Sequence, residues 1–246
     1  MKKCSVLLLL MALINFSFAQ KIEYKIYPVD ETKNDTTLTQ FIEVLEEVIS
    51  AKDTFRLYKM LDKNIVSSFG GGICGKQGFI ENWNLETPES SLVWKTMKRI
   101  IEMGGVAENG RVNGTTVDSV IFHFPYANAN KLFDPLQKKN PEYDFNPYST
   151  IICVKENIPI YKSPNNKSVI VDNLSYDIVI MDYGKSKKQN IISSYNSWKW
   201  IYITTIDQSI SGWVLNNDDI YFLGDYSLIL EKVNNEYKIT GFFPFD

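Results

Sequence analysis

Between residues 36 and 104 the hydrophobic positions recur every three to four residues, which is the spacing of helices that bury one face. The first stripe consists of Phe41, Val44, Leu45, Val48 and Ile49, and a later one of Val93, Trp94, Met97, Ile100 and Ile101. We expect Thr37 or Thr39 to cap the first helix and Asp53 to cap a second. Gly104 suits a left-handed C-cap of the last helix.

The pattern changes to strands after these helices. Residues 117–124 alternate, with Val120, Phe122 and Phe124 on one face and Ile121 and His123 on the other. Residues 125–149 contain four prolines and are expected to be a linker or a long ordered loop. From 150 to 221 short apolar runs alternate with turns, which predicts a small β-barrel.

Two further strands, 226–233 and 236–242, meet at Asn234-Asn235. Asparagine tolerates a positive φ, so this step suits a tight hairpin. An isolated hairpin is marginal in water, so we expect this one to pair with the N-terminal half. The predicted class is α+β: an α+β domain of residues 36–148 plus 223–246, with an all-β barrel of residues 150–222 inserted. Residues 20–35 are expected to be a leader before the first helix.

The order of motifs within residues 150–221 resembles a bacterial SH3-like (SH3b) domain. The motifs lie at 157–164, 168–174, 177–181 and 198–203, and Gly212-Trp213-Val214 follows them. The resemblance implies a domain that binds extended peptides or cell-wall stem peptides in a shallow aromatic groove and does not catalyse. The N-terminal region, with its helices, strand and terminal hairpin, weakly resembles the cystatin-like, nuclear-transport-factor-like α+β fold. An additional helix at 91–103 departs from that pattern.

Residues 1–19 have the pattern of a secretory signal peptide. Lys2 and Lys3 precede an apolar run that is too short to span a bilayer, and Ser17 and Ala19 provide small residues for cleavage before Gln20. We therefore expect an exported protein, periplasmic or extracellular, with no transmembrane segment after cleavage. An uncleaved membrane anchor is the alternative.

The net charge of the chain limits the classes of partner that it is expected to bind. With Lys2 and Lys3 removed from the 26 basic residues, 24 remain against 29 acidic ones, which argues against nucleic acid as a partner. The expected partners are a peptide, peptidoglycan or another exported protein.

Two cysteines, Cys74 and Cys153, are left after cleavage. Two free thiols are favoured, although an oxidising compartment permits a bridge between them.

Aromatic residues of the predicted barrel are the candidate ligand-binding set, because Tyr and Trp are useful in a half-exposed position. The candidates are Tyr161, Tyr176, Trp198 and Tyr202, whereas Trp200 and Trp213 are expected to be core or half-core. The basic segment 185–190 is expected to be a solvated hairpin tip that could meet an acidic partner.

Catalysis has weaker support, and no catalytic residue, metal or cofactor is expected. The alternative is a cell-envelope hydrolase or a small-molecule enzyme using Cys74 and His123, because a nucleophilic cysteine needs a base. Packing is the favoured interpretation of Cys74. The glycine-rich stretch before it lacks the Ser or Thr of a phosphate loop, since Gln77 follows Lys76. One histidine and two distant cysteines do not form a zinc set by their spacing.

Overall fold

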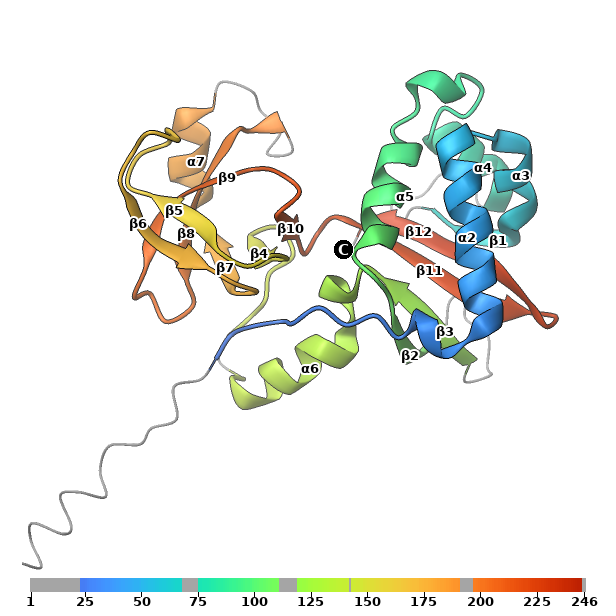
Figure 1. Cartoon of the computed structure of the whole chain (residues 1–246), viewed down its shortest axis with the longest axis horizontal. Coiled ribbons are helices and arrows are strands. Elements are labelled where there is room, and N and C mark those ends of the chain that lie inside the picture. Colours follow the sequence, from blue (N-terminus) through green and yellow to red (C-terminus); the bar gives the residue numbers. More distant parts are fainter. Residues whose placement is uncertain (1–22, 68–74, 111–118, 142, 191–196, 245–246) are drawn as a thin grey trace, which may run out of the picture.

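The computed structural model describes residues 23–67, 75–110, 119–141, 143–190 and 197–244, and the predicted signal peptide lies outside them. The α+β class is confirmed: the described residues form six α-helices and twelve strands in two sheets (Figure 1). No helix of the described residues is long and apolar enough to cross a membrane.

The elements divide between an α+β domain and a β-domain. The helices are α2 (Thr36–Ala51), α3 (Thr54–Met60), α4 (Gly75–Asn82), α5 (Val93–Glu102), α6 (Asn130–Lys139) and α7 (Tyr183–Gln189). The first sheet, that of the α+β domain, has the order β1 (Leu61–Val66), β12 (Glu236–Pro244), β11 (Tyr226–Val233), β3 (Ser119–Phe124) and β2 (Val106–Gly110). The second, that of the β-domain, has the order β10 (Ile220–Phe222), β4 (Thr150–Cys153), β7 (Ile178–Met181), β8 (Trp200–Thr205), β9 (Ser211–Leu215), β5 (Ile158–Tyr161) and β6 (Ile170–Leu174).

The C-terminal hairpin completes the first sheet. Strand β11 pairs antiparallel with β3, placing Ile229 opposite His123, and β12 pairs parallel with β1. Asn234 and Asn235 have φ values of 51° and 67° and join the two strands, as their sequence predicts. The chain therefore leaves the first sheet after β3, builds the β-domain, and returns to the same sheet at β11.

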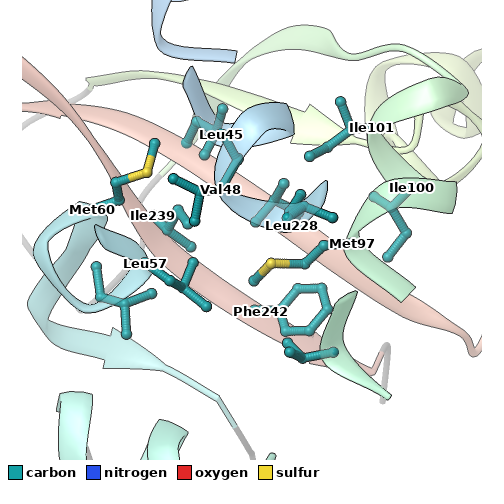
Figure 2. Close-up of a cluster of buried hydrophobic side chains, with 14 of the residues drawn as sticks. Leu45, Val48, Leu57, Met60, Met97, Ile100, Ile101, Leu228, Ile239 and Phe242 are labelled. Atoms are coloured by element: carbon teal, nitrogen blue, oxygen red, sulfur yellow. The ribbon is translucent and has the colours of Figure 1, made fainter. Parts of the chain in front are cut away.

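Helices α2, α3 and α5 cover one face of the first sheet (Figure 1). Their apolar stripes meet Leu228, Ile239 and Phe242 of the hairpin in one buried cluster (Figure 2). Val48 and Met97 lie at its centre and are fully buried. Burying this surface is the main stabilising contribution of the α+β domain.

The helix caps differ in part from those expected from sequence. Asp35, not Thr37 or Thr39, caps α2, because its extended backbone places the carboxylate to accept from the N–H groups of Thr37 and Leu38 at 2.9 and 3.0 Å. Asp53 caps α3 as predicted, accepting from the N–H of Arg56. Gly104 has a φ of +86°, and a Cβ there would lie 2.9 Å from the Cβ of Asp30.

Two helices lie where loops were expected. Helix α6 occupies part of the predicted linker despite Pro135 in its interior. Helix α7 replaces the predicted hairpin tip, because Asp182 accepts from the N–H of Lys185 and caps it. The buried hydroxyl of Ser186 then accepts from the N–H of Tyr202, which attaches α7 to β8.

A third apolar cluster joins the two domains. It combines Tyr126 and Leu136 from the α+β side with Ile152, Ile178 and Tyr221 from the β-domain. The predicted leader also contributes, because Ile26 is buried in this cluster and its N–H donates to the carbonyl of Tyr176 at 3.0 Å. The predicted leader thus contacts both domains, which its mixed composition did not predict.

Candidate ligand-binding site

Three aromatic residues lie side by side on adjacent strands of the β-domain. Trp213 of β9 is opposite Tyr161 of β5 and opposite Tyr202 of β8. Directly paired residues of adjacent strands share one face of a sheet, so the three side chains form a continuous line. All three are partly exposed. We call Tyr161, Trp213 and Tyr202 the aromatic row.

Strand alternation explains why these residues face outwards. Their neighbours Ile160, Ile201, Ile203 and Val214 are buried in the core on the opposite face of the strands. Gly212 lets β9 approach β5, since a Cβ there would lie 2.7 Å from the carbonyl oxygen of Tyr161.

Ring contacts hold the aromatic row in place. The rings of Tyr202 and Trp213 lie 5.3 Å apart at 82°, and those of Tyr161 and Trp200 lie 5.5 Å apart at 86°. Both are edge-to-face pairs, a favourable geometry for aromatic rings. Trp200, two residues before Tyr202 on β8, lies on the same face of the sheet as the row, but it is only 7% exposed. The row therefore offers rings whose positions are set before any ligand arrives.

Helix α7 adds positive charge beside the row. The Nζ of Lys185 lies 4.1 Å from the centroid of the Tyr202 ring, a cation–π contact. The same ammonium group lies 3.4 Å from a carboxylate oxygen of Asp182, and the Nζ of Lys187 lies over a different ring, 5.7 Å from that of Tyr183. The surface thus combines π faces with one ammonium group, which suits a ligand that carries both apolar groups and a carboxylate.

The other two predicted site residues lie elsewhere. Trp198 is 2% exposed and belongs to the core of the β-domain, which contradicts its predicted place at a ligand surface. It precedes β8, so the alternation that points Trp200 and Tyr202 outwards does not apply to it. Tyr176 lies in the turn between β6 and β7, where its ring packs 5.5 Å from that of Tyr27. Neither residue belongs to the aromatic row.

The predicted thiol–imidazole pair is described only in part, because Cys74 lies outside the described residues. His123 is buried in β3, with its Nδ1 3.1 Å from a carboxylate oxygen of Glu108 on β2. Cys153 is buried, and desolvation raises the pKa of its thiol. No cluster of metal-ligating side chains occurs among the described residues.

Trp213 is the member of the row that sequence analysis placed among core or half-core residues. Trp213 lies two residues from Ser211 and next to the apolar Val214, and this alternation indicates an outward side chain.

Comparison of the chain with protein-family models, with curated proteins and with solved structures finds no match. The resemblances to SH3-like and cystatin-like folds therefore stay predictions.

Proposed function

We propose that this protein is an exported, non-catalytic binding protein whose aromatic row contacts a peptide, either a cell-wall stem peptide or a segment of another exported protein. The observation that carries the proposal is the register of Tyr161, Trp213 and Tyr202, which puts three partly exposed aromatic side chains on one face. Tyr and Trp are enriched where proteins bind peptides, because each presents a large apolar surface at a low cost in conformational entropy.

The kind of peptide follows from the neighbouring charges. Lys185 lies against the Tyr202 ring, and 55% of its side chain is exposed although it pairs with Asp182. An acidic group that reaches the end of the row at β8 would gain a charge-assisted hydrogen bond from such an ammonium group. An extended peptide with at least one carboxylate is therefore the expected ligand.

Chemistry at the described thiol is disfavoured on physical grounds. The thiolate, not the thiol, is the nucleophile, and burial of Cys153 raises the pKa of its thiol. His123 is buried with Glu108 between two strands, which suits a structural pair. Binding through the aromatic row thus explains more of the described surface than hydrolysis does.

Retention on purified peptidoglycan tests the cell-wall form of the proposal. The chain is compared with Tyr161→Ala and Tyr202→Ala, with Tyr202→Phe to keep the ring, and with Tyr148→Ala as a control at a 62% exposed tyrosine outside the row. We expect both alanine variants in the row to lose retention, and Tyr202→Phe and Tyr148→Ala to keep it. If the parent chain is not retained, or if all variants are retained equally, the cell-wall proposal is wrong.

A further inference from the structure

A concave region lies where the two domains meet. It is formed between α5 and the turn that joins β9 to β10, and it consists of two adjoining hollows of about 600 and 460 Å³. Both hollows are lined by Lys95, Arg99 and Asp218. We call the two together the α5 cleft. It belongs to different strands and helices from those of the aromatic row.

Most charged groups in the α5 cleft are already paired. Arg99 donates to the carbonyl oxygen of Ile220 at 2.5 Å and lies 3.2 Å from Asp218 and 3.6 Å from Asp225. Lys98, in the smaller hollow, is paired with Glu102. The charges of Lys98 and Glu102 cancel, whereas Arg99 faces two carboxylates, so Arg99, Asp218 and Asp225 together carry one net negative charge.

Lys95 is different. It is exposed, it lines both hollows, and it makes no ion pair with any residue that the structure describes. Its ammonium group is therefore available to an anion that enters the cleft. Asp218 and Asp225 also line the larger hollow, so a multiply charged anion would be repelled there and a singly charged one is favoured.

The larger hollow also has an apolar wall. The rings of Trp83 and Tyr226 lie 4.8 Å apart, and both are partly exposed where they line it. Leu92, on the same hollow, is 71% exposed. An apolar, planar group would shield all three from water.

The smaller hollow contains a polar group without a partner. Tyr126 lines it and is 2% exposed, and its buried hydroxyl has no hydrogen-bond partner among the described residues. Buried polar groups in native proteins are nearly always hydrogen-bonded, and a polar group within the smaller hollow would give this hydroxyl a partner.

We propose that the α5 cleft binds a small organic monoanion, a planar apolar molecule with one carboxylate or sulfonate group. The planar part lies against Trp83 and Leu92, and the anionic group contacts Lys95. A purely inorganic anion would leave the aromatic wall unused, whereas a neutral apolar molecule would leave Lys95 without a partner. The cleft thus gives the protein a small-molecule site that is separate from the aromatic row.

The test is a fluorescence titration of the full chain with 1-anilinonaphthalene-8-sulfonate, a monoanion with a planar naphthalene ring that emits strongly when it leaves water. The variants are Lys95→Gln and Leu92→Glu, with matched controls Lys167→Gln and Val169→Glu at exposed positions of the β-domain. Exposed substitutions of this kind change stability little. A shared unfolding midpoint then shows that any change in binding is local.

We expect emission to rise on titration of the parent chain. Lys95→Gln removes a charge-assisted contact, and Leu92→Glu replaces an apolar contact with a charge that repels the anion, so each should weaken binding about tenfold or more. The two controls and Tyr202→Ala should bind within about twofold of the parent. The proposal is overturned if emission does not rise, if the controls weaken binding as much as the cleft variants, or if Tyr202→Ala alone abolishes it.

Discussion

Replacing Arg99 of α5 with methionine should destabilise the protein substantially. Methionine keeps much of the aliphatic length but removes the guanidinium, which contacts the Ile220 carbonyl and the carboxylates of Asp218 and Asp225. Because Arg99 is on a helix of the α+β domain and Ile220 is in the β-domain, the change removes polar contacts between the two.

The magnitude follows from the three contacts. A hydrogen bond from a charged group, such as that to Ile220, contributes about 1.5–3 kcal/mol. The pair with Asp218 adds about 0–1 kcal/mol, because that carboxylate is mostly exposed. Asp225 is largely buried, and leaving it unpaired costs about 1–3 kcal/mol more. Together these contributions amount to about 2.5–7 kcal/mol, and we expect a loss of about 3–5 kcal/mol, the usual cost of removing one partner of a buried ion pair.

The loss should depend on pH with a definite sign. Burial raises the pKa of Asp225 above its ordinary value near 3.8, and the charge of Arg99 opposes that rise. Without Arg99 the pKa rises further, so the folded variant holds this proton more strongly than the unfolded chain. Stability from such a group is present below pH 4 and is lost as the pH rises through the raised pKa, so the deficit of Arg99→Met should be larger at pH 8 than at pH 4.

Urea unfolding at both pH values measures this. Lys98→Met is the control, because it removes an exposed pair within the same helix and should cost less than about 0.5 kcal/mol. Adding Asp225→Asn to Arg99→Met should recover part of the loss, since it removes the unpaired carboxyl group. If Arg99→Met changes the free energy of unfolding by less than about 0.5 kcal/mol, the inference that Arg99 joins the domains is wrong.

Two other outcomes follow from the structure. Asp35→Ala should lower the free energy of unfolding by about 1–2 kcal/mol through loss of the cap of α2, whereas Asp35→Asn keeps the cap. Hydrogen bonds from Lys232, the Leu38 N–H and Tyr237 hold the pKa of Asp35 well below its usual range. The contribution of this carboxylate to stability is therefore present above pH 4 and is lost on acidification. Urea unfolding of Asp35→Asn should accordingly depend less on acid pH than that of the parent. In a Cys74→Ser chain, Cys153 should react with a thiol reagent only after unfolding, because its thiol is buried. The absorbance of the reacted reagent should therefore rise only when denaturant is added. A rapid reaction of the folded chain would contradict the burial of Cys153.

The parts of the fold that can be predicted from the sequence are those that neighbouring residues along the chain determine. The stripes of α2 and α5 and the hairpin at Asn234-Asn235 follow from spacing and turn chemistry, and the structure contains all three. Helix α6 was missed because Pro135 argues against a helix interior, and the packing of Leu136 against the domain boundary is not visible in sequence.

The candidate site shows the same limit. Tyr161 and Tyr202 were predicted from residue type alone, but their common neighbour Trp213 depends on the register of β9 with two other strands. Trp198 has the same residue type and was assigned wrongly to the surface, because its burial depends on how the chain enters β8. The α5 cleft has no sequence signal, since its walls come from both domains.

The most direct test of binding through the aromatic row is a nuclear magnetic resonance titration of the tryptophan indole N–H signals with a soluble cell-wall stem peptide. Assignment uses one Trp→Phe variant for each tryptophan. We predict that the Trp213 signal shifts in a saturable way, and that the signal of Trp94, whose Nε1 donates to the Pro88 carbonyl in the α+β domain, stays in place. A titration in which Trp213 does not move, or in which only Trp83 of the α5 cleft moves, would contradict the account.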